Sequence, residues 1–298
     1  MTDFSKQHVF ITGGASGIGL AMAQAFGRRG ARITIADINA ARLAEAVRKL
    51  SGEGLVCGGQ VLDVTRAEGW ASAVSAADAD FGPIDVLCNN AGVNQASRQD
   101  GGAIMLADMS EDLFRLVLDI NVVGLFLGIR AVVPGMIERG HGHVVNTASG
   151  AGLIAPPGLG AYSASKFAAV GLSEALRGEL AGKGIGVSVL CPGGVQSSLV
   201  NTSAERREEA IGHGSDQAAG FVSERPVNPD MMLAISAAER VVEAVAANEH
   251  YILTHPEYAP LFEERFAAIR KAIGTSAQPG YRDPQWLLDV SRNPVYTD

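Results

Sequence analysis

Two side chains one helical turn apart could carry proton chemistry. Tyr162 and Lys166 belong to the run Tyr-Ser-Ala-Ser-Lys, and residues with helical spacing follow it. Residues four apart share a helix face, so the ammonium of Lys166 can sit close to the phenol of Tyr162. A nearby positive charge favours the phenolate, and a Tyr with a lowered pKa can exchange a proton with an alcohol. The pair therefore indicates general acid–base catalysis, although ordinary surface pairs show the same spacing.

A glycine-rich turn near the N-terminus indicates a phosphate site. The apolar run from His8 to Thr12 is typical of a buried strand, and helical spacing follows the glycines. A turn of this kind lets backbone N–H groups approach a pyrophosphate, and a helix N-terminus favours the negative charge. The alternative is a tight connection without a ligand. The turn residues that we expect beside a cofactor are Gly13, Ser16, Gly17, Ile18 and Gly19.

The next strand indicates which dinucleotide is bound. It ends in Asp37, about 20 residues after the turn, where a carboxylate can accept hydrogen bonds from the adenosine ribose. The same carboxylate would repel a 2′-phosphate, so we predict NAD rather than NADP. Asp37 can also cap the following helix, and the two roles are compatible. Four neighbouring positions lack a compensating Arg or Lys: Ala15, Ser16, Ile38 and Asn39.

Strands alternate with helical stretches along the chain, which indicates βαβ units. We predict an α/β fold with a single doubly wound Rossmann-type parallel sheet of about seven strands and helices on both faces. Ligands of such sheets bind beyond the carboxyl ends of the strands. The expected strands are His8–Thr12, Arg32–Asp37, Leu55–Val64, Ile84–Asn89, His143–Ser149, Ile185–Cys191 and Tyr251–Thr254. The expected later helices include Ser110–Glu138, Tyr162–Ala181, Leu233–Ala247 and Leu261–Ile273.

In their order and spacing these motifs resemble the short-chain dehydrogenase/reductase superfamily over about residues 6–197. Thr12 to Gly19 resembles its cofactor turn, Asp63-Val64 its adenine-side pair, and Asn89 to Gly92 its NNAG segment. The resemblance places a catalytic tetrad at Asn121, Ser149, Tyr162 and Lys166. It implies further cofactor contacts from Asp63, Val64, Asn90, Ala91, Gly92, Tyr162, Lys166, Pro192, Gly193, Val195 and Ser197, with Ser197 where Thr is more usual.

The resemblance also implies a role for each tetrad member. Tyr162 would be the general acid or base, and Lys166 would lower its pKa and bind the ribose hydroxyls. Ser149 would hydrogen-bond the substrate oxygen, and Asn121 would connect Lys166 to water through its backbone. Because Asn is a poor helix-interior residue, the alternative is that Asn121 simply faces water. The implied activity is that of an NAD-dependent alcohol dehydrogenase or ketone reductase.

The last hundred residues depart from the family pattern. We expect residues 1–298 to form a single domain, with a cofactor-binding and catalytic core at 6–197 and a substrate lid at 198–235. Residues 236–298 would hold the last helix, the seventh strand and a C-terminal extension. A long lid with a similar C-terminal strand and helix resembles the aryl-ether Cα-dehydrogenases of lignin-fragment breakdown. Expected apolar pocket residues are Leu153, Ile154, Pro156, Pro157, Leu159, Phe221, Val222, Met231 and Met232.

Those apolar residues favour a bulky aromatic alcohol, with a steroid-like or terpenoid alcohol as the second choice. Met231 and Met232 could equally pack the lid onto the core. Two other functions remain open. One is an NADP-dependent carbonyl reductase, and the other is a non-catalytic dinucleotide-binding regulator.

Composition and residue types limit the partners, the compartment and the metal sites that we expect. A net charge of -8 argues against nucleic acid and against an anionic membrane. The N-terminus is polar and no apolar run reaches membrane-spanning length, so we expect a cytoplasmic protein. Cys57, Cys88 and Cys191 suggest buried reduced thiols, and His141 with His143 gives too few ligands for a metal site. The resemblance implies a homodimer or homotetramer, and Leu261–Ile273 could serve an interface.

Overall fold

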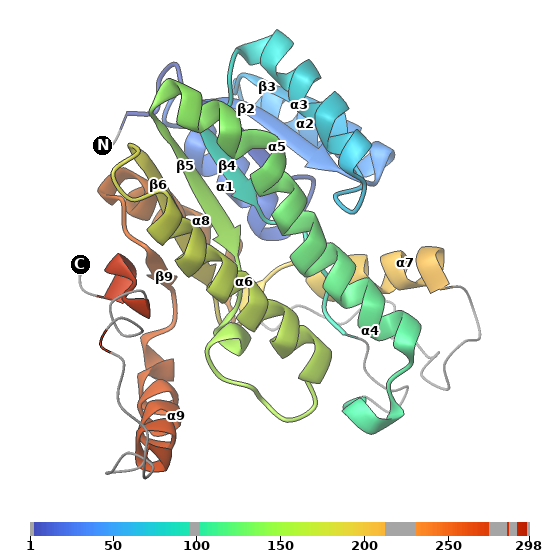
Figure 1. Ribbon diagram of the computed structural model, residues 1–298. Helices are drawn as coiled ribbons and strands as arrows, with labels where there is room; N and C mark the ends of the chain where they lie inside the picture. The colour runs from blue at the N-terminus through green and yellow to red at the C-terminus, as the bar shows by residue number, and fades with distance from the viewer. Residues whose placement is uncertain (1–2, 96–101, 212–229, 274–284, 286–290, 297–298) are drawn as a thin grey trace.

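A seven-stranded parallel sheet forms the centre of the protein (Figure 1). The computed structural model describes residues 3–95, 102–211, 230–273, 285 and 291–296. The strand order is β3-β2-β1-β4-β5-β6-β9, and every neighbouring pair is parallel. The α/β Rossmann fold expected from the sequence is confirmed. The strands are β1 His8–Thr12, β2 Arg32–Asp37, β3 Cys57–Val61, β4 Val86–Asn89, β5 Gly142–Thr147, β6 Ile185–Cys191 and β9 Tyr251–Leu253.

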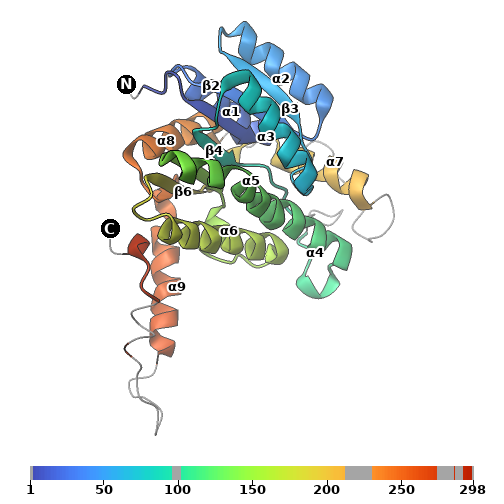
Figure 2. The same ribbon diagram turned by 45° about the horizontal axis from the view of Figure 1, so that its top comes forward.

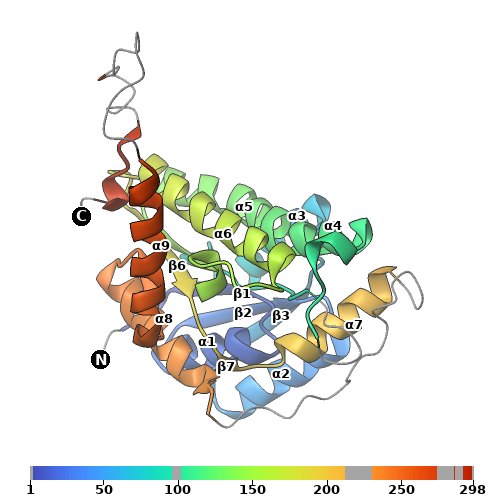
Figure 3. The same cartoon turned by 90° about the horizontal axis from the view of Figure 1, so that it is seen from below.

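Helices cover both faces of this sheet, as Figure 3 shows. One layer contains α1 Gly17–Gly27, α2 Ala40–Gly52 and α8 Ala234–Ala247. The other contains α3 Ala67–Phe81, α4 Glu111–Leu118, α5 Gly124–Arg139 and α6 Gly160–Glu179. With both faces covered, the central strands are buried throughout and read as continuous apolar runs in the sequence.

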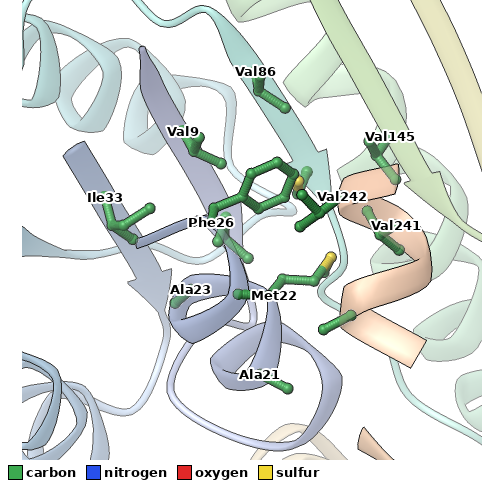
Figure 4. Packing of buried hydrophobic residues seen from close by; sticks show 14 of the residues in the cluster. Val9, Ala21, Met22, Ala23, Phe26, Ile33, Val86, Val145, Val241 and Val242 are labelled. Atoms are coloured by element: carbon green, nitrogen blue, oxygen red, sulfur yellow. The ribbon is translucent and has the colours of Figure 1, made fainter. Parts of the chain in front are cut away.

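The core beneath α1 shows how the first βαβ unit is fixed (Figure 4). Phe26 and Met22 of α1 are fully buried and point toward Val9 of β1 and toward Val242 of α8. Burying each such side chain contributes about 1.5 to 3 kcal/mol. Packing of this kind holds the N-terminus of α1 against the end of β1, where the glycine-rich turn lies.

Three local features differ from the expected elements. β3 is shorter than Leu55–Val64 because it is an edge strand with only β2 beside it. A π-helical turn, η2 (Asp119–Val123), interrupts the long helix expected between Ser110 and Glu138. The segment after β6 holds a helix, α7 (Leu199–Ile211), and a parallel pair, β7 (Val195–Gln196) with β8 (Met232–Leu233). Cys57 is only partly buried, so the expectation of three buried thiols is wrong for this residue.

The helical stretch Glu111–Arg139 corrects the expectation that no apolar run reaches membrane-spanning length. Among the described residues it is the single helix of 29 residues whose length and mean hydropathy of 2.1 would allow it to cross a membrane. Within that apolar window 44% is buried inside the protein. Leu113, Val117 and Val132 pack in the same cluster as α3 and α6. The stretch therefore serves as a core helix of the Rossmann fold.

The C-terminal part begins at β9 on the edge of the sheet. It continues through η4 (Pro256–Tyr258) into α9 (Ala259–Ala272), which extends away from the sheet in Figure 2. No residue of α9 is buried. A last turn, η5 (Pro294–Tyr296), returns to α6, where the hydroxyl of Tyr296 donates a hydrogen bond to Glu174 at 2.7 Å.

Candidate active site

A cavity of about 990 Å³ lies at the carboxyl ends of the strands. Its walls come from the turns after β1, β2, β3, β4, β5 and β6 and from α6 and α7. Every catalytic or cofactor-binding residue expected from the sequence lines this cavity, with the exception of Gly19 and Asn121. Its volume is at the upper end of the range for ligand pockets, as an extended ligand requires.

The glycine-rich turn is shaped for close backbone approach. Gly13 and Gly17 have φ values of 61° and 52°, in the left-handed region that favours glycine. A Cβ on Gly19 would collide with the carbonyl oxygen of Gly13, so this glycine lets α1 pack against the turn rather than lining the cavity. Ser16 makes no side-chain cap, and the first turn of α1 holds no acidic residue. Its N–H groups therefore suit a pyrophosphate.

The segment after β4 is tied to the same turn through Thr12. The Thr12 hydroxyl accepts hydrogen bonds from the backbone N–H groups of Asn90 at 2.9 Å and Ala91 at 3.0 Å. The Asn90 side chain donates to the Thr12 carbonyl oxygen at 3.0 Å. A Cβ on Gly92 would lie 3.1 Å from Asn121 Oδ1 and 3.5 Å from Lys166 Nζ. Because Gly92 has no side chain, the segment after β4 can lie directly against Asn121 and Lys166.

Asp37 lies at the end of β2, facing the glycine-rich turn. Its carboxylate accepts hydrogen bonds from the backbone N–H groups of Ala15 at 3.3 Å and Asn39 at 3.1 Å. The cap of α2 is instead Asn39, whose side chain accepts from the Arg42 N–H at 2.9 Å. Asp37 thus keeps lone pairs directed at the cavity that it lines, as an acceptor for ribose hydroxyls needs.

Helix α7 lies beside Asp63 and Val64, the pair expected near the adenine. We define α7 with its two ion pairs as the α7 clamp. Arg206 of α7 donates to Asp63 Oδ2 at 3.0 Å. Glu205, the preceding residue, pairs with Arg42 in the first turn of α2. All four side chains line the cavity. The sequence analysis missed both arginines and Glu205, because partners 163 residues apart leave no local pattern.

Lys166 and Tyr162 lie together on α6, as predicted from their spacing. The Lys166 ammonium is 5.6 Å from the centre of the Tyr162 ring and donates to the Thr147 carbonyl oxygen at 2.9 Å. Burial lowers the pKa of Lys166 to about 8. Burial also raises the pKa of Tyr162, against the effect of a hydrogen bond with Ser149. Among the protein's own groups, burial therefore outweighs the lowering of the Tyr162 pKa expected from Lys166.

Ser149 and Asn121 are placed by different elements. Ser149 follows β5 and caps η3 (Gly150–Gly152), accepting from the Ala151 N–H at 3.2 Å, and its side chain reaches Tyr162. Asn121 sits in the π-helical turn η2, a type of turn that often occurs at functional sites. Its amide donates to Ser165 Oγ at 2.9 Å and to the Val93 carbonyl oxygen at 2.8 Å, and Oδ1 accepts from the Val93 N–H. The alternative that Asn121 faces water is wrong.

The expected substrate walls are placed only in part. Met231 lines the cavity, whereas Leu153 packs against the core cluster that includes Ala148 and Val170. Met232 forms part of β8. Phe221 and Val222 lie outside the described residues, as do residues 96–101 of the connection after β4. In the described ranges no group of three or more His, Cys, Asp or Glu side chains has the geometry of a metal site.

Comparison with known proteins places the chain in a family. The family model for the short chain dehydrogenase matches residues 7–208, which is more than half of the chain. The chain belongs to the short-chain dehydrogenase/reductase family, and it is an NAD(P)-dependent oxidoreductase that acts on CH–OH groups.

Individual relatives cover nearly the full length. A C alpha-dehydrogenase of Sphingobium sp. (strain NBRC 103272 / SYK-6) is 33% identical over 96% of this chain and 91% of its own length. A CLA biosynthesis dehydrogenase/reductase of Lactiplantibacillus plantarum is 33% identical over 90% and 95%. A short chain dehydrogenase/reductase from Burkholderia phymatum, solved in complex with NAD, superposes with a TM-score of 0.82 at 32% identity. It covers 94% of this chain and 100% of its own. The resemblance to Cα-dehydrogenases expected from the sequence is thus matched by a relative that aligns over nearly the whole chain.

Proposed function

We propose that this protein is an NAD-dependent dehydrogenase that interconverts a secondary alcohol and its ketone. One observation carries the proposal. Tyr162, Ser149 and Lys166 line the same cavity as the glycine-rich turn and Asp37. A proton-transfer group and a dinucleotide site that share one cavity can act on a single substrate carbon.

Tyr162 would be the catalytic acid–base group. In oxidation it takes the proton of the substrate hydroxyl, and in reduction it returns that proton. Ser149 donates a hydrogen bond to the substrate oxygen as negative charge develops there. Lys166, held by the Thr147 carbonyl, supplies positive charge beside Tyr162 and donors for ribose hydroxyls. NAD, when bound, would accept the hydride.

The proposal specifies NAD because a carboxylate, that of Asp37, lines the cavity at the expected ribose position. Asp37 would accept from the 2′-hydroxyl and repel a 2′-phosphate. Arg42 lines the same cavity and is the observation that favours the alternative, an NADP-dependent carbonyl reductase. Its pairing with Glu205 neutralises that cation, so the balance supports NAD.

The proposed substrate is a bulky apolar or aromatic secondary alcohol. The similarity to a C alpha-dehydrogenase supports this class, as does Met231 on the cavity wall. Residues 198–235, which include α7 and β8, would act as the substrate lid within one domain. A non-catalytic dinucleotide-binding regulator is a weaker alternative, because Tyr162 and Lys166 are both present and both face the cavity.

We also propose a cytoplasmic homodimer or homotetramer without a nucleic-acid or membrane partner. The net charge of -8 supports the absence of nucleic acid and of anionic lipid as partners. Helix α9 exposes Leu261, Phe266 and Ile269, which would suit a subunit contact. Light scattering after gel filtration would give the number of subunits, and a monomeric mass would reject this part of the proposal.

A screen of secondary alcohols with NAD, followed by NADH absorbance, tests the activity. Aromatic diols and lignin-like fragments should be the best substrates, with kcat/KM for NAD exceeding that for NADP. Equal kcat/KM values for the two cofactors would reject the assignment of Asp37. Absence of turnover with every alcohol and ketone, in a protein that binds NADH, would favour the regulator.

A further inference from the structure

We infer that His255 and Tyr258, from the C-terminal part of the chain, are positioning residues for the nicotinamide end of the site. Both lie beyond residues 7–208, the region that the family model matches. The inference rests on the proposed function, because it concerns the turn after β6 that would hold the nicotinamide. We call His255 and Tyr258 the C-terminal brace.

His255 follows β9, and both nitrogens of its ring form hydrogen bonds with the turn after β6. The Gly193 N–H donates to His255 Nδ1 at 3.0 Å, and His255 Nε2 lies 3.2 Å from the Gly194 carbonyl oxygen. Because Nδ1 accepts, the ring proton must be on Nε2, where it donates to Gly194. The hydroxyl of Thr254 lies 2.7 Å from Nδ1 and shares the single lone pair of that nitrogen with the Gly193 N–H. The imidazole thus holds the peptide groups on either side of the Gly193–Gly194 pair.

Close packing between the His255 ring and Gly193 adds to these hydrogen bonds. A Cβ on Gly193 would come within 2.6 Å of the His255 ring, so the turn and the ring are in direct contact. Gly193 and Gly194 both line the cavity, as does Pro192 before them. A turn rich in glycine has high conformational freedom, and an external bond is an effective way to limit it.

Tyr258 extends the brace to the catalytic serine. Its ring stacks on that of His255, with 5.7 Å between ring centres and an interplanar angle of 21°. The Tyr258 ring also meets Gly150, where a Cβ would lie 2.8 Å from Cε2. Gly150 follows Ser149 and donates its N–H to the Pro192 carbonyl oxygen at 2.8 Å. One stacked pair therefore supports both the nicotinamide turn and the Ser149 loop.

This geometry predicts an effect confined to one end of the cofactor. His255→Ala removes two hydrogen bonds from the turn and should weaken NADH binding by about tenfold. Binding of ADP-ribose, which lacks the nicotinamide, should stay within about twofold of the wild type, because the adenosine end is untouched. His255→Asn retains an acceptor for the Gly193 N–H and should recover most of the NADH affinity.

His250 provides a matched control. It lies at the opposite end of the same strand, where Nδ1 is 2.9 Å from the Val187 carbonyl oxygen, away from the cavity. His250→Asn should leave the affinities for NADH and ADP-ribose unchanged, even where it lowers the melting temperature.

The experiment is a titration of wild type and the three variants with NADH and with ADP-ribose, alongside thermal melting. A rise in the ratio of the two dissociation constants for His255→Ala, with recovery in His255→Asn, supports the brace. An equal change for both ligands, or no change for either, overturns it. If the Ala variant does not fold, the Asn variant decides: it should lose about threefold for NADH alone, and equal losses would overturn the inference. Failure of the wild type to bind NADH would instead reject the proposed function.

Discussion

The two ends of the cavity are built from different kinds of contact. At the end that holds the proposed catalytic residues, Lys166 and Asn121 are buried and bond to backbone groups or to neighbouring buried side chains. At the end proposed to bind the adenosine, α7 contributes the ion pairs Arg42–Glu205 and Arg206–Asp63, whose side chains remain partly exposed. Burial makes the first set rigid and strongly interdependent, whereas exposed ion pairs contribute at most about 1 kcal/mol each.

This difference implies a division of roles. The catalytic end should determine whether the reaction occurs, because each group there has a fixed position and few alternative partners. The α7 clamp should tune which cofactor is used and how fast it exchanges, since its two ion pairs are weak and screened by salt. Substitutions at each end test this division of roles.

Lys166→Met should reduce kcat/KM by about 1,000-fold, because it removes the ammonium beside Tyr162 and a donor to the ribose. Its melting temperature should not fall. A buried ammonium whose pKa is lowered to about 8 is held unfavourably, and Met has similar length without the charge. Lys183→Met, at an exposed position, is the control and should be silent. Activity of Lys166→Met within tenfold of the wild type would contradict the role given to the catalytic end.

The pH profile should report on Tyr162 and on Lys166, whose pKa of about 8 lies in the same range. Burial raises the pKa of Tyr162, so the phenolate forms only as pH rises, and kcat/KM for alcohol oxidation should increase on the alkaline side. Ketone reduction needs the protonated phenol and should decline over the same range. The hydrogen bond with Ser149 lowers the pKa of Tyr162, so Ser149→Ala should move the limb to higher pH and slow turnover by about 100-fold. A limb that stays in place in that variant would argue against Tyr162 as the titrating group.

Glu205→Gln should change cofactor preference by a smaller factor. It frees Arg42 from its ion pair and should raise kcat/KM for NADP about threefold to fivefold, with little change for NAD. Asp37→Ala should further reduce the preference for NAD over NADP, because it removes the carboxylate that repels the 2′-phosphate. Glu209→Gln removes the same charge from α7 but from a residue paired with Arg206, so it is the control. Equal gains in Glu205→Gln and Glu209→Gln would show that overall charge, rather than Arg42, is responsible.

The sequence predicted those parts of the site whose geometry is local. The spacing of Tyr162 and Lys166 placed them together because a helix repeats every few residues. The glycine-rich turn and Asp37 could be placed because parallel strands bring their carboxyl ends to one edge of the sheet. The π-helical turn around Asn121 was not predicted, since its bonds to Val93 and Ser165 depend on packing between distant segments.

The features that the sequence did not predict depend on contacts between distant segments or on burial. The pair Arg42–Glu205 joins residues 163 apart, and no periodic pattern links them. Leu153 was expected in the pocket, but an apolar loop residue can face either a pocket or the core, and it packs on the core. The Tyr162 pKa was expected to fall because Lys166 is near, yet burial has the larger effect in the opposite direction.

We propose above all that Tyr162 transfers the proton while the cavity around it binds the dinucleotide. Tyr162→Phe tests it most directly, with kcat measured for the best secondary alcohol and the dissociation constant of NADH measured by titration. Tyr251→Phe is the control, because the Tyr251 hydroxyl bonds Glu174 and does not line the cavity. We predict that kcat of Tyr162→Phe falls by about 1,000-fold while NADH affinity stays within twofold. Turnover at the wild-type rate in that variant would contradict the account.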